Sequence, residues 1–170
     1  MIDFKIRIYI VLKENVKYNK NMIASHKVIT EEFVKRSVIK FLTNQGWSKN
    51  LEYDDLRAQG VDIKVTHSKY GRTFFIEAKG ASISRSGSEV AFIYSLGQII
   101  TRMKNPKARY YYGIALPEKS ASIALRRLPY QFAVSACVHI FSVHQGGSVT
   151  WYKPTDIKKY QQGQEKKSKD

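Results

Sequence analysis

The stretch from Gly60 to Gly80 alternates apolar and polar residues, and this alternation restricts the fold more than any other feature of the chain. If a turn is centred between Lys69 and Tyr70, opposed residues have numbers that sum to 139. Successive side chains on a strand point to opposite sides of a sheet. One face of the hairpin would then be wholly apolar, comprising Val61, Ile63, Val65, Phe74, Ile76 and Ala78. The segment therefore predicts an antiparallel hairpin with one face in a hydrophobic core.

The other face of this hairpin is mostly polar, and in the same register Asp62 lies directly opposite Glu77. Two carboxylates in that arrangement repel, so we expect a cation beside them. Mg²⁺ takes oxygen ligands, often one or two carboxylates with water and substrate phosphate, and the Ala78 carbonyl is a further candidate ligand. Lys79, two residues beyond Glu77 on the same side, is placed to orient the attacking water or help deprotonate it, and to offset phosphate charge. These residues predict metal-assisted phosphodiester hydrolysis.

Asp62 followed by Ile76-Glu77-Ala78-Lys79 resembles the signature of the PD-(D/E)XK nuclease superfamily, which includes type II restriction enzymes, archaeal Holliday-junction resolvases and RecB-type nucleases. Gly60-Val61-Asp62-Ile63 is similar to the version found in Mrr-like and resolvase-like members, with Val61 where the familiar proline stands. The resemblance covers about residues 30 to 143. It implies a restriction endonuclease-like core and cleavage of DNA with Mg²⁺, for which Mn²⁺ can substitute. The alternative interpretation is an ordinary amphipathic hairpin with solvated charges.

A helix is expected before the hairpin, from Glu31 to Gln45, with Thr30 as its N-cap. Its buried stripe would comprise Val34, Val38, Phe41 and Leu42. The resemblance implies that a glutamate of this first helix reaches the metal, and Glu31 or Glu32 is the candidate. The alternative is that both acids simply favour the positive end of the helix dipole.

A second helix is expected after the hairpin, from Glu89 to Lys104, with Phe92, Leu96, Ile99, Ile100 and Met103 buried. Gln98 and Arg102 lie four residues apart on its flank. RecB-like relatives carry a Gln-x-x-x-Tyr motif on the corresponding helix; Gln98 matches the first position, and Arg102 stands in place of the tyrosine. Both are candidates to complete the site or hold a DNA strand, and exposed polar residues of a helix are the alternative.

Three further residues are candidate nucleic-acid contacts. Arg57 lies just upstream of Asp62, and Ser84 and Arg85 belong to a hydroxyl-rich loop after Lys79. This loop leads into the N-terminus of the next helix, where free backbone N–H groups favour anions. A substrate-clamping loop and a solvated linker are both consistent with it.

The remaining segments complete an α/β pattern. Strands are expected at Trp47 to Tyr53, Arg109 to Leu116, Ala133 to Val143 and Ser148 to Tyr152, with a crossover helix within Lys119 to Gln131 that Pro129 ends. A strand after a crossover helix is typically parallel to its neighbour. The pattern predicts an α/β fold, a three-layer sandwich with a mixed central β-sheet.

A chain of 170 residues is expected to form one domain. We expect an N-terminal strand and linker over 1–28, the nuclease-like domain over 29–152 and a disordered basic tail over 153–170. The chain carries 29 Lys and Arg against 14 Asp and Glu, a formal charge of +15, so a nucleic acid is the first candidate partner. Cys137 is the single cysteine, which favours a cytoplasmic protein without disulfides. No apolar run approaches the about 20 residues that span a bilayer.

These observations predict a Mg²⁺-dependent DNA endonuclease with Asp62, Glu77, Lys79 and Gln98 in its site. A homodimer is expected because duplex cleavage needs two cuts and one small subunit carries one site. The sequence leaves open a junction resolvase, a restriction-type enzyme and a subunit of a larger DNA-processing assembly. The alternatives from other classes are a non-catalytic basic nucleic-acid-binding module and a ribosome-associated structural protein.

Overall fold

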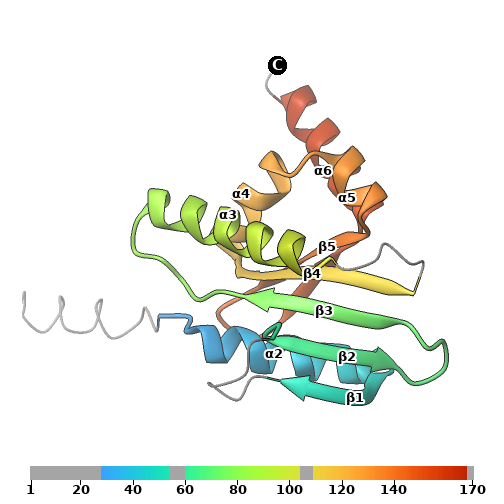
Figure 1. Cartoon of the computed structure of the whole chain (residues 1–170). Helices are drawn as coiled ribbons and strands as arrows, with labels where there is room; N and C mark the ends of the chain where they lie inside the picture. The colour runs from blue at the N-terminus through green and yellow to red at the C-terminus, as the bar shows by residue number, and fades with distance from the viewer. Residues whose placement is uncertain (1–27, 54–59, 104–108, 168–170) are drawn as a thin grey trace, which may run out of the picture.

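The computed structural model describes residues 28–53, 60–103 and 109–167, and within them six strands form one sheet (Figure 1). In sheet order these strands are β1 (Trp47–Tyr53), β2 (Ile63–His67), β3 (Thr73–Ala78), β4 (Tyr110–Pro117), β5 (Val138–Val143) and β6 (Val149–Tyr152). The first three are antiparallel, β3, β4 and β5 are parallel, and β6 returns antiparallel to β5. The predicted α/β fold with a mixed sheet is confirmed.

The hairpin of β2 and β3 has the predicted register. Ile63 pairs with Ile76 and Thr66 with Thr73, so opposed residue numbers sum to 139. Gly71 follows the turn with φ +59°, a left-handed conformation that glycine adopts without a steric penalty. The alternation of the sequence therefore determined both the pairing and the turn.

The helix α2 (Glu31–Asn44) covers one face of the sheet (Figure 1). Thr30 is its N-cap, as predicted, and the Thr30 side chain accepts a hydrogen bond from the Phe33 backbone N–H at 3.2 Å. The buried layer under α2 contains Val34, Val38 and Leu42 from the helix, with Ile63, Val65, Phe74, Ile76 and Ala78 from the hairpin. The apolar face of the hairpin is thus buried as expected, except for Val61, which is only half-buried.

Four helices pack on the opposite face: α3 (Arg85–Arg102), α4 (Glu118–Arg127), α5 (Tyr130–Ser135) and α6 (Pro154–Lys167). Their apolar side chains meet Ile114, Leu116 and Ile140 of the central strands. Figure 1 shows α3 running above β3 and β4, on the side away from α2. Helices therefore cover both faces of the sheet, in layers.

The edge strand β1 is irregular. Its pairing with β2 shifts register twice, between Trp47 and Lys49 and between Lys49 and Glu52. Only Trp47 is buried, and Glu52 forms an ion pair with Lys64 of β2 at 2.8 Å.

Two expected boundaries and one expected burial need correction. The helix α3 begins at Arg85 rather than Glu89, because Ser84 acts as its N-cap and accepts a hydrogen bond from the Gly87 N–H at 2.9 Å. The segment expected to open a strand at Ala133 is helical up to Ser135, directly after Pro129. Ile100, expected to be buried, has an exposed fraction of 45%.

The disordered tail predicted over 153–170 is also corrected, because Pro154–Lys167 form α6. Ile157 is fully buried, and the Gln161 amide donates hydrogen bonds to the carbonyls of Leu125 and Leu128, both at 2.8 Å. These few contacts dock a helix whose sequence is otherwise polar. The predicted strand and linker within residues 1–27, and Arg57, lie outside the described residues. Among the helices in the described ranges, none is long and apolar enough to cross a membrane.

Candidate active site at the end of β3

Asp62 immediately precedes β2 and is fixed by two contacts. The Ala78 backbone N–H donates a hydrogen bond to Asp62 Oδ2 at 2.7 Å, which ties the carboxylate to the end of β3. Lys35 of α2 places its Nζ 3.1 Å from Asp62 Oδ1. The lysine side chain is only 6% exposed, so its charge sits in a largely buried setting where a carboxylate partner is needed.

Glu31 joins the same group from the first turn of α2. Lys35 Nζ lies 3.1 Å from Glu31 Oε1, so one ammonium bridges the carboxylates of Glu31 and Asp62. Lys79 Nζ lies 3.5 Å from Glu31 Oε2. Of the two glutamates considered at this helix start, Glu31 is the one brought to the site, because Glu32 pairs with Arg36 at 2.6 Å on the surface.

Gly80 permits this approach of β3 to α2. A Cβ atom at Gly80 would lie 2.8 Å from the Glu31 backbone N and 3.1 Å from the Ile29 carbonyl oxygen, closer than side-chain carbons pack against backbone. The next residue, Ala81, donates its N–H to the Ile29 carbonyl at 2.7 Å. The end of β3 is therefore held directly against the start of α2, and Lys79 is held beside Glu31.

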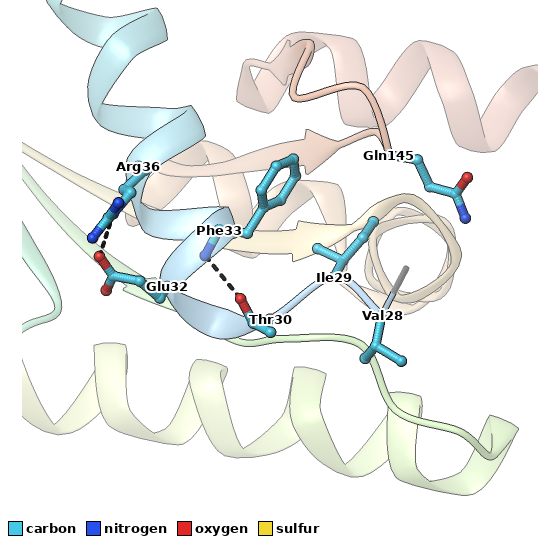
Figure 2. Close-up of a pocket in the computed structure, with 7 residues that line it drawn as sticks. All are labelled: Val28, Ile29, Thr30, Glu32, Phe33, Arg36 and Gln145. Carbon is cyan, nitrogen blue, oxygen red and sulfur yellow. Dashed lines mark hydrogen bonds and ion pairs between the residues drawn. The ribbon is translucent and has the colours of Figure 1, made fainter. Parts of the chain in front are cut away.

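A pocket of about 320 Å³ lies on another side of the start of α2 (Figure 2). Figure 2 shows Thr30 bonded to the Phe33 N–H and Arg36 paired with Glu32, while Val28 and Ile29 supply apolar walls. Glu31 is not part of its lining. The pocket therefore neighbours the acid cluster without sharing its residues.

Glu77 is the most deeply buried acid of the site, with an exposed fraction of 1%. It forms an ion pair with Arg102 at the end of α3. A buried carboxylate is tolerated when such a partner balances its charge. Gln98 lies one helical turn before Arg102, and its Oε1 is buried without a hydrogen-bond partner in the part of the chain that the structure describes.

Lys79 lies between the helices of the two faces. Besides its contact with Glu31 of α2, its Nζ lies 5.9 Å from the ring centre of Tyr94 on α3. Its side chain is 22% exposed, so it remains accessible from solvent. This placement agrees with a lysine that meets a ligand at the surface of the site.

Asp62 and Glu77 have separate cationic side chains as partners, and the divalent cation expected between them stays a prediction. Asp62 is balanced by Lys35 on the α2 side of the sheet, and Glu77 by Arg102 on the α3 side. Across the described ranges, no three Asp, Glu, His or Cys side chains form a ready metal-binding group. The repulsion inferred from the register is instead relieved by two cationic side chains from different helices.

Lys35 and Gly80 were missed by the sequence analysis. Lys35 lies four residues after Glu31, at a spacing typical of helical ion pairs, and next to Val34 of the buried stripe. A lysine beside a buried stripe is a detectable signal for a buried ion pair. Gly80 has the weaker signal of a glycine directly after the Glu77-Ala78-Lys79 triplet.

The oxygen donors of this region suit a hard divalent cation, because carboxylate and amide oxygens are the ligands that Mg²⁺ takes. Two observations support the fit. The Lys35 ammonium lies between the Glu31 and Asp62 carboxylates, at a point where positive charge is stabilised. The buried Gln98 Oε1 lacks a donor or cation among the described residues.

The side chains predicted to contact nucleic acid next to the site already interact, in part, with other residues of the protein. The Ser84 hydroxyl caps α3 through Gly87. The Arg85 side chain is 84% exposed, and its Nε is 3.8 Å from Glu89. Arg102, expected to hold a DNA strand, pairs with Glu77 and keeps 31% of its side chain exposed. Contact of these residues with DNA stays a prediction.

Comparison of the chain with protein-family models, with curated proteins and with solved structures finds no match. The site is therefore interpreted from its own geometry and chemistry.

Proposed function

We propose that this protein is a metal-dependent endonuclease that hydrolyses DNA phosphodiester bonds at the end of β3. The observation that carries the proposal is the convergence of Glu31, Asp62 and Lys79 in a chain of formal charge +15. Lys35 bridges the first two residues, Lys79 contacts Glu31, and Glu77 lies two residues before Lys79 in the sequence. The order of helix, antiparallel β1 to β3, helix and parallel β4 agrees with the restriction endonuclease-like core implied by the PD-(D/E)XK resemblance.

Each residue of the site has a definite role in this proposal. Asp62, Glu77 and Glu31 would hold Mg²⁺ or Mn²⁺, with the Ala78 carbonyl and the Gln98 amide as further oxygen donors. The bound ion supplies a polarised phosphoryl group and a coordinated water of lowered pKa. Lys79 offsets the charge of the phosphate and orients the attacking water.

Lys35 and Arg102 neutralise carboxylates in the metal-free protein. Arg102, which keeps 31% of its side chain exposed, becomes available to a phosphate once Glu77 has another partner. The arrangement thus combines acids that bind a cation with bases that bind the substrate anion.

The test is a cleavage assay on supercoiled plasmid, linear duplex and a four-way junction, each with Mg²⁺, Mn²⁺ or EDTA. We expect metal-dependent cutting that falls by about 100-fold or more in Glu77→Gln and in Lys79→Ala, the scale of losing one electrostatic group of an active site. Lys40→Ala removes an equal charge from the exposed side of α2 and should cut as the wild type does. Cutting that persists in EDTA, or at the wild-type rate in Glu77→Gln, would contradict the proposal.

The second candidate is a non-catalytic basic nucleic-acid-binding module. It is favoured by the fact that Glu31, Asp62 and Glu77 are each already paired with a cationic side chain. Salt-sensitive DNA binding by the wild type, with no cutting of any substrate under any metal, would select this candidate.

A further inference from the structure

A second cavity, of about 520 Å³, lies at the opposite edge of the sheet from the candidate active site. It is reached from residues at the starts of β3, β4 and β5, and Gln45, just beyond the end of α2, borders it. The strand β3 begins beside this cavity and ends at Ala78 in the candidate active site. At about 3.3 Å per residue, the two places are about 20 Å apart.

Six of the residues that line the cavity carry aromatic rings. The rings belong to Trp47, His67, Tyr70, Tyr111, His139 and Trp151. Tyr70 leans over His67 with ring centres 4.6 Å apart and planes inclined by 34°. Tyr70 is 67% exposed, so an aromatic face remains open to solvent at the mouth of the cavity. Such faces stack on nucleobases, whichever the base, because every base has a π-face.

Two cationic side chains stand against these rings. The Arg72 guanidinium carbon is 6.0 Å from the ring centre of Tyr70 and 5.5 Å from that of Tyr111. Lys153 Nζ is 5.3 Å from the ring centre of Trp151. The described lining contains no carboxylate, and neither Arg72 nor Lys153 forms an ion pair with a described residue. The cavity therefore presents positive charge that an anion can balance.

His139 adds a polar group to the wall. The Trp151 Nε1–H donates a hydrogen bond to His139 Nδ1 at 2.9 Å, so the neutral imidazole carries its hydrogen on Nε2. Burial, with a smaller effect of Lys153, lowers the pKa of His139 to about 3, which keeps the ring neutral near pH 7. Nε2–H is the donor that this side chain can offer to a carbonyl or ring nitrogen of a base.

We propose that this cavity binds one unpaired nucleotide of a nucleic acid, with its base stacked against Tyr70 and Tyr111 and its phosphate held by Arg72 and Lys153. Each kind of group in the cavity matches one part of a nucleotide that proteins recognise. The tyrosine rings match the π-face of the base, the two cations match the phosphate, and the neutral His139 N–H matches the edge of the base. An apolar ligand would leave the cations unused. A base within a duplex keeps both faces stacked and cannot enter.

The inference deepens the proposed function in one respect, and that part rests on it. A nuclease with this cavity about 20 Å from its scissile position selects DNA that has a single-stranded segment beside a duplex, rather than a continuous duplex.

The binding test uses the intrinsic fluorescence of tryptophan. The chain has two tryptophans, Trp47 and Trp151, and both line the cavity, so quenching reports on this place directly. The protein is titrated in EDTA with a 12-residue oligothymidylate, a blunt duplex of the same length and thymidine monophosphate. We expect the oligothymidylate to quench the emission and the blunt duplex to bind at least tenfold more weakly to the quenching site.

Two variants and two matched controls complete the experiment. Tyr70→Ala should weaken binding in the quenching titration about tenfold, because it removes a ring on which the base stacks. Arg72→Gln should weaken it to a similar extent, because it removes a cation that holds the phosphate. Tyr53→Ala, an exposed tyrosine of β1, and Lys40→Gln, an exposed charge of α2, should titrate as the wild type does. Because the cavity variants alter exposed or surface-reaching side chains, circular dichroism should confirm an unchanged fold.

The outcomes separate this inference from the nuclease proposal. Absence of quenching, or wild-type titrations for both cavity variants, would overturn the nucleotide site. Equal quenching by duplex and single strand would overturn its preference for unpaired bases. If thymidine monophosphate quenches the emission with the same affinity as the oligothymidylate, the site is one for free nucleotides rather than for a nucleotide of a nucleic acid. EDTA prevents metal-dependent cutting, so a failed cleavage assay leaves each of these results unaffected.

Discussion

His139 is a titratable side chain within an aromatic layer. Its ring centre lies 5.0 Å from that of Phe74 and 5.6 Å from that of Trp151. Desolvation is the main cause that lowers its pKa to about 3; the charge of Lys153 lowers the pKa further, and Asp156 opposes the shift. In the unfolded chain the pKa returns to about 6.5. Between these values the unfolded state binds a proton that the folded state does not, so stability rises with pH.

We expect His139 to lower the free energy of unfolding as the pH drops from about 6 towards 3. Its contribution should reach up to about 1.4 kcal/mol per pH unit. Urea unfolding at a series of pH values measures the slope. His139→Gln retains an acceptor for the Trp151 indole and should lose this part of the slope. Carboxylates titrate in both proteins and cancel in the difference. An identical pH dependence in the two proteins would show that His139 is not held neutral.

At the level of elements, the hairpin was predictable because its information is local. Period-two alternation fixed the faces of β2 and β3, and one turn fixed their pairing, so the register agreed residue by residue. The helices α5 and α6 were not predictable in this way. α5 has six residues and α6 buries Ile157 with few other side chains, so neither has a sustained apolar period. Both depend on tertiary contacts that a local pattern does not contain.

The candidate site was likewise predictable only in part. The sequence correctly placed Arg102 on the flank of α3 that faces the site, where it contacts Glu77. The role of Gln98 on the same helix stays a prediction. The sequence did not predict the contact of Asp62 with Lys35, because that pair joins a helix to a strand 27 residues away in numbering and has no periodic signal. The strand register determines which residues are opposite each other in the hairpin. The ion-pair partners of the hairpin carboxylates, in contrast, come from the covering helices α2 and α3.

The junction of β3 with α2 supplies a prediction about Gly80. A methyl group there would meet the Glu31 backbone N at 2.8 Å, and backbone cannot yield as a flexible side chain can. We expect Gly80→Ala to lower the free energy of unfolding by about 1–3 kcal/mol, as overpacking does, and to separate Lys79 from Glu31. Urea unfolding measures the first effect.

Gly97→Ala is the matched control, because Gly97 lies in α3 with nothing within 4 Å of an added Cβ. Alanine in a helix is favoured over glycine by about 0.5–1 kcal/mol, so this variant should be more stable than the wild type. Equal stability of Gly80→Ala and the wild type would show that the junction tolerates a side chain.

Across the whole molecule, the candidate site is electrically balanced without an added ion. Glu31, Asp62 and Glu77 face Lys35 of α2, Lys79 directly after β3, and Arg102 of α3. Opposite faces of the sheet are thereby joined to its central hairpin by ion pairs. Each of the three carboxylates therefore has a cationic side chain of the fold as a partner.

We accordingly expect the wild type to unfold cooperatively in EDTA, and under the proposed function Mg²⁺ should add only the stabilisation that its own binding supplies. Arg102→Gln should leave the buried Glu77 unbalanced at a cost towards the lower end of about 3–5 kcal/mol, since Arg102 is partly exposed. Under the proposed function, Mg²⁺ should restore part of that loss.

Arg127→Gln breaks the exposed pair with Glu89 and should change stability by about 1 kcal/mol at most. A Glu77→Gln/Arg102→Gln double variant should be less destabilised than the sum of its single variants, because each removes the other's unpaired charge. Additive losses would mean that Glu77 and Arg102 do not act as a pair.

The irregular edge strand β1 has a consequence for the behaviour of the protein in concentrated solution. A straight edge strand offers a row of free backbone groups on which another chain can pair, and such edges seed aggregation. The two register shifts of β1, and the charged Lys49 and Glu52 at those shifts, interrupt that row. Another chain therefore finds no continuous template there, and the six-stranded sheet is protected against growth into a larger β-aggregate from its β1 side.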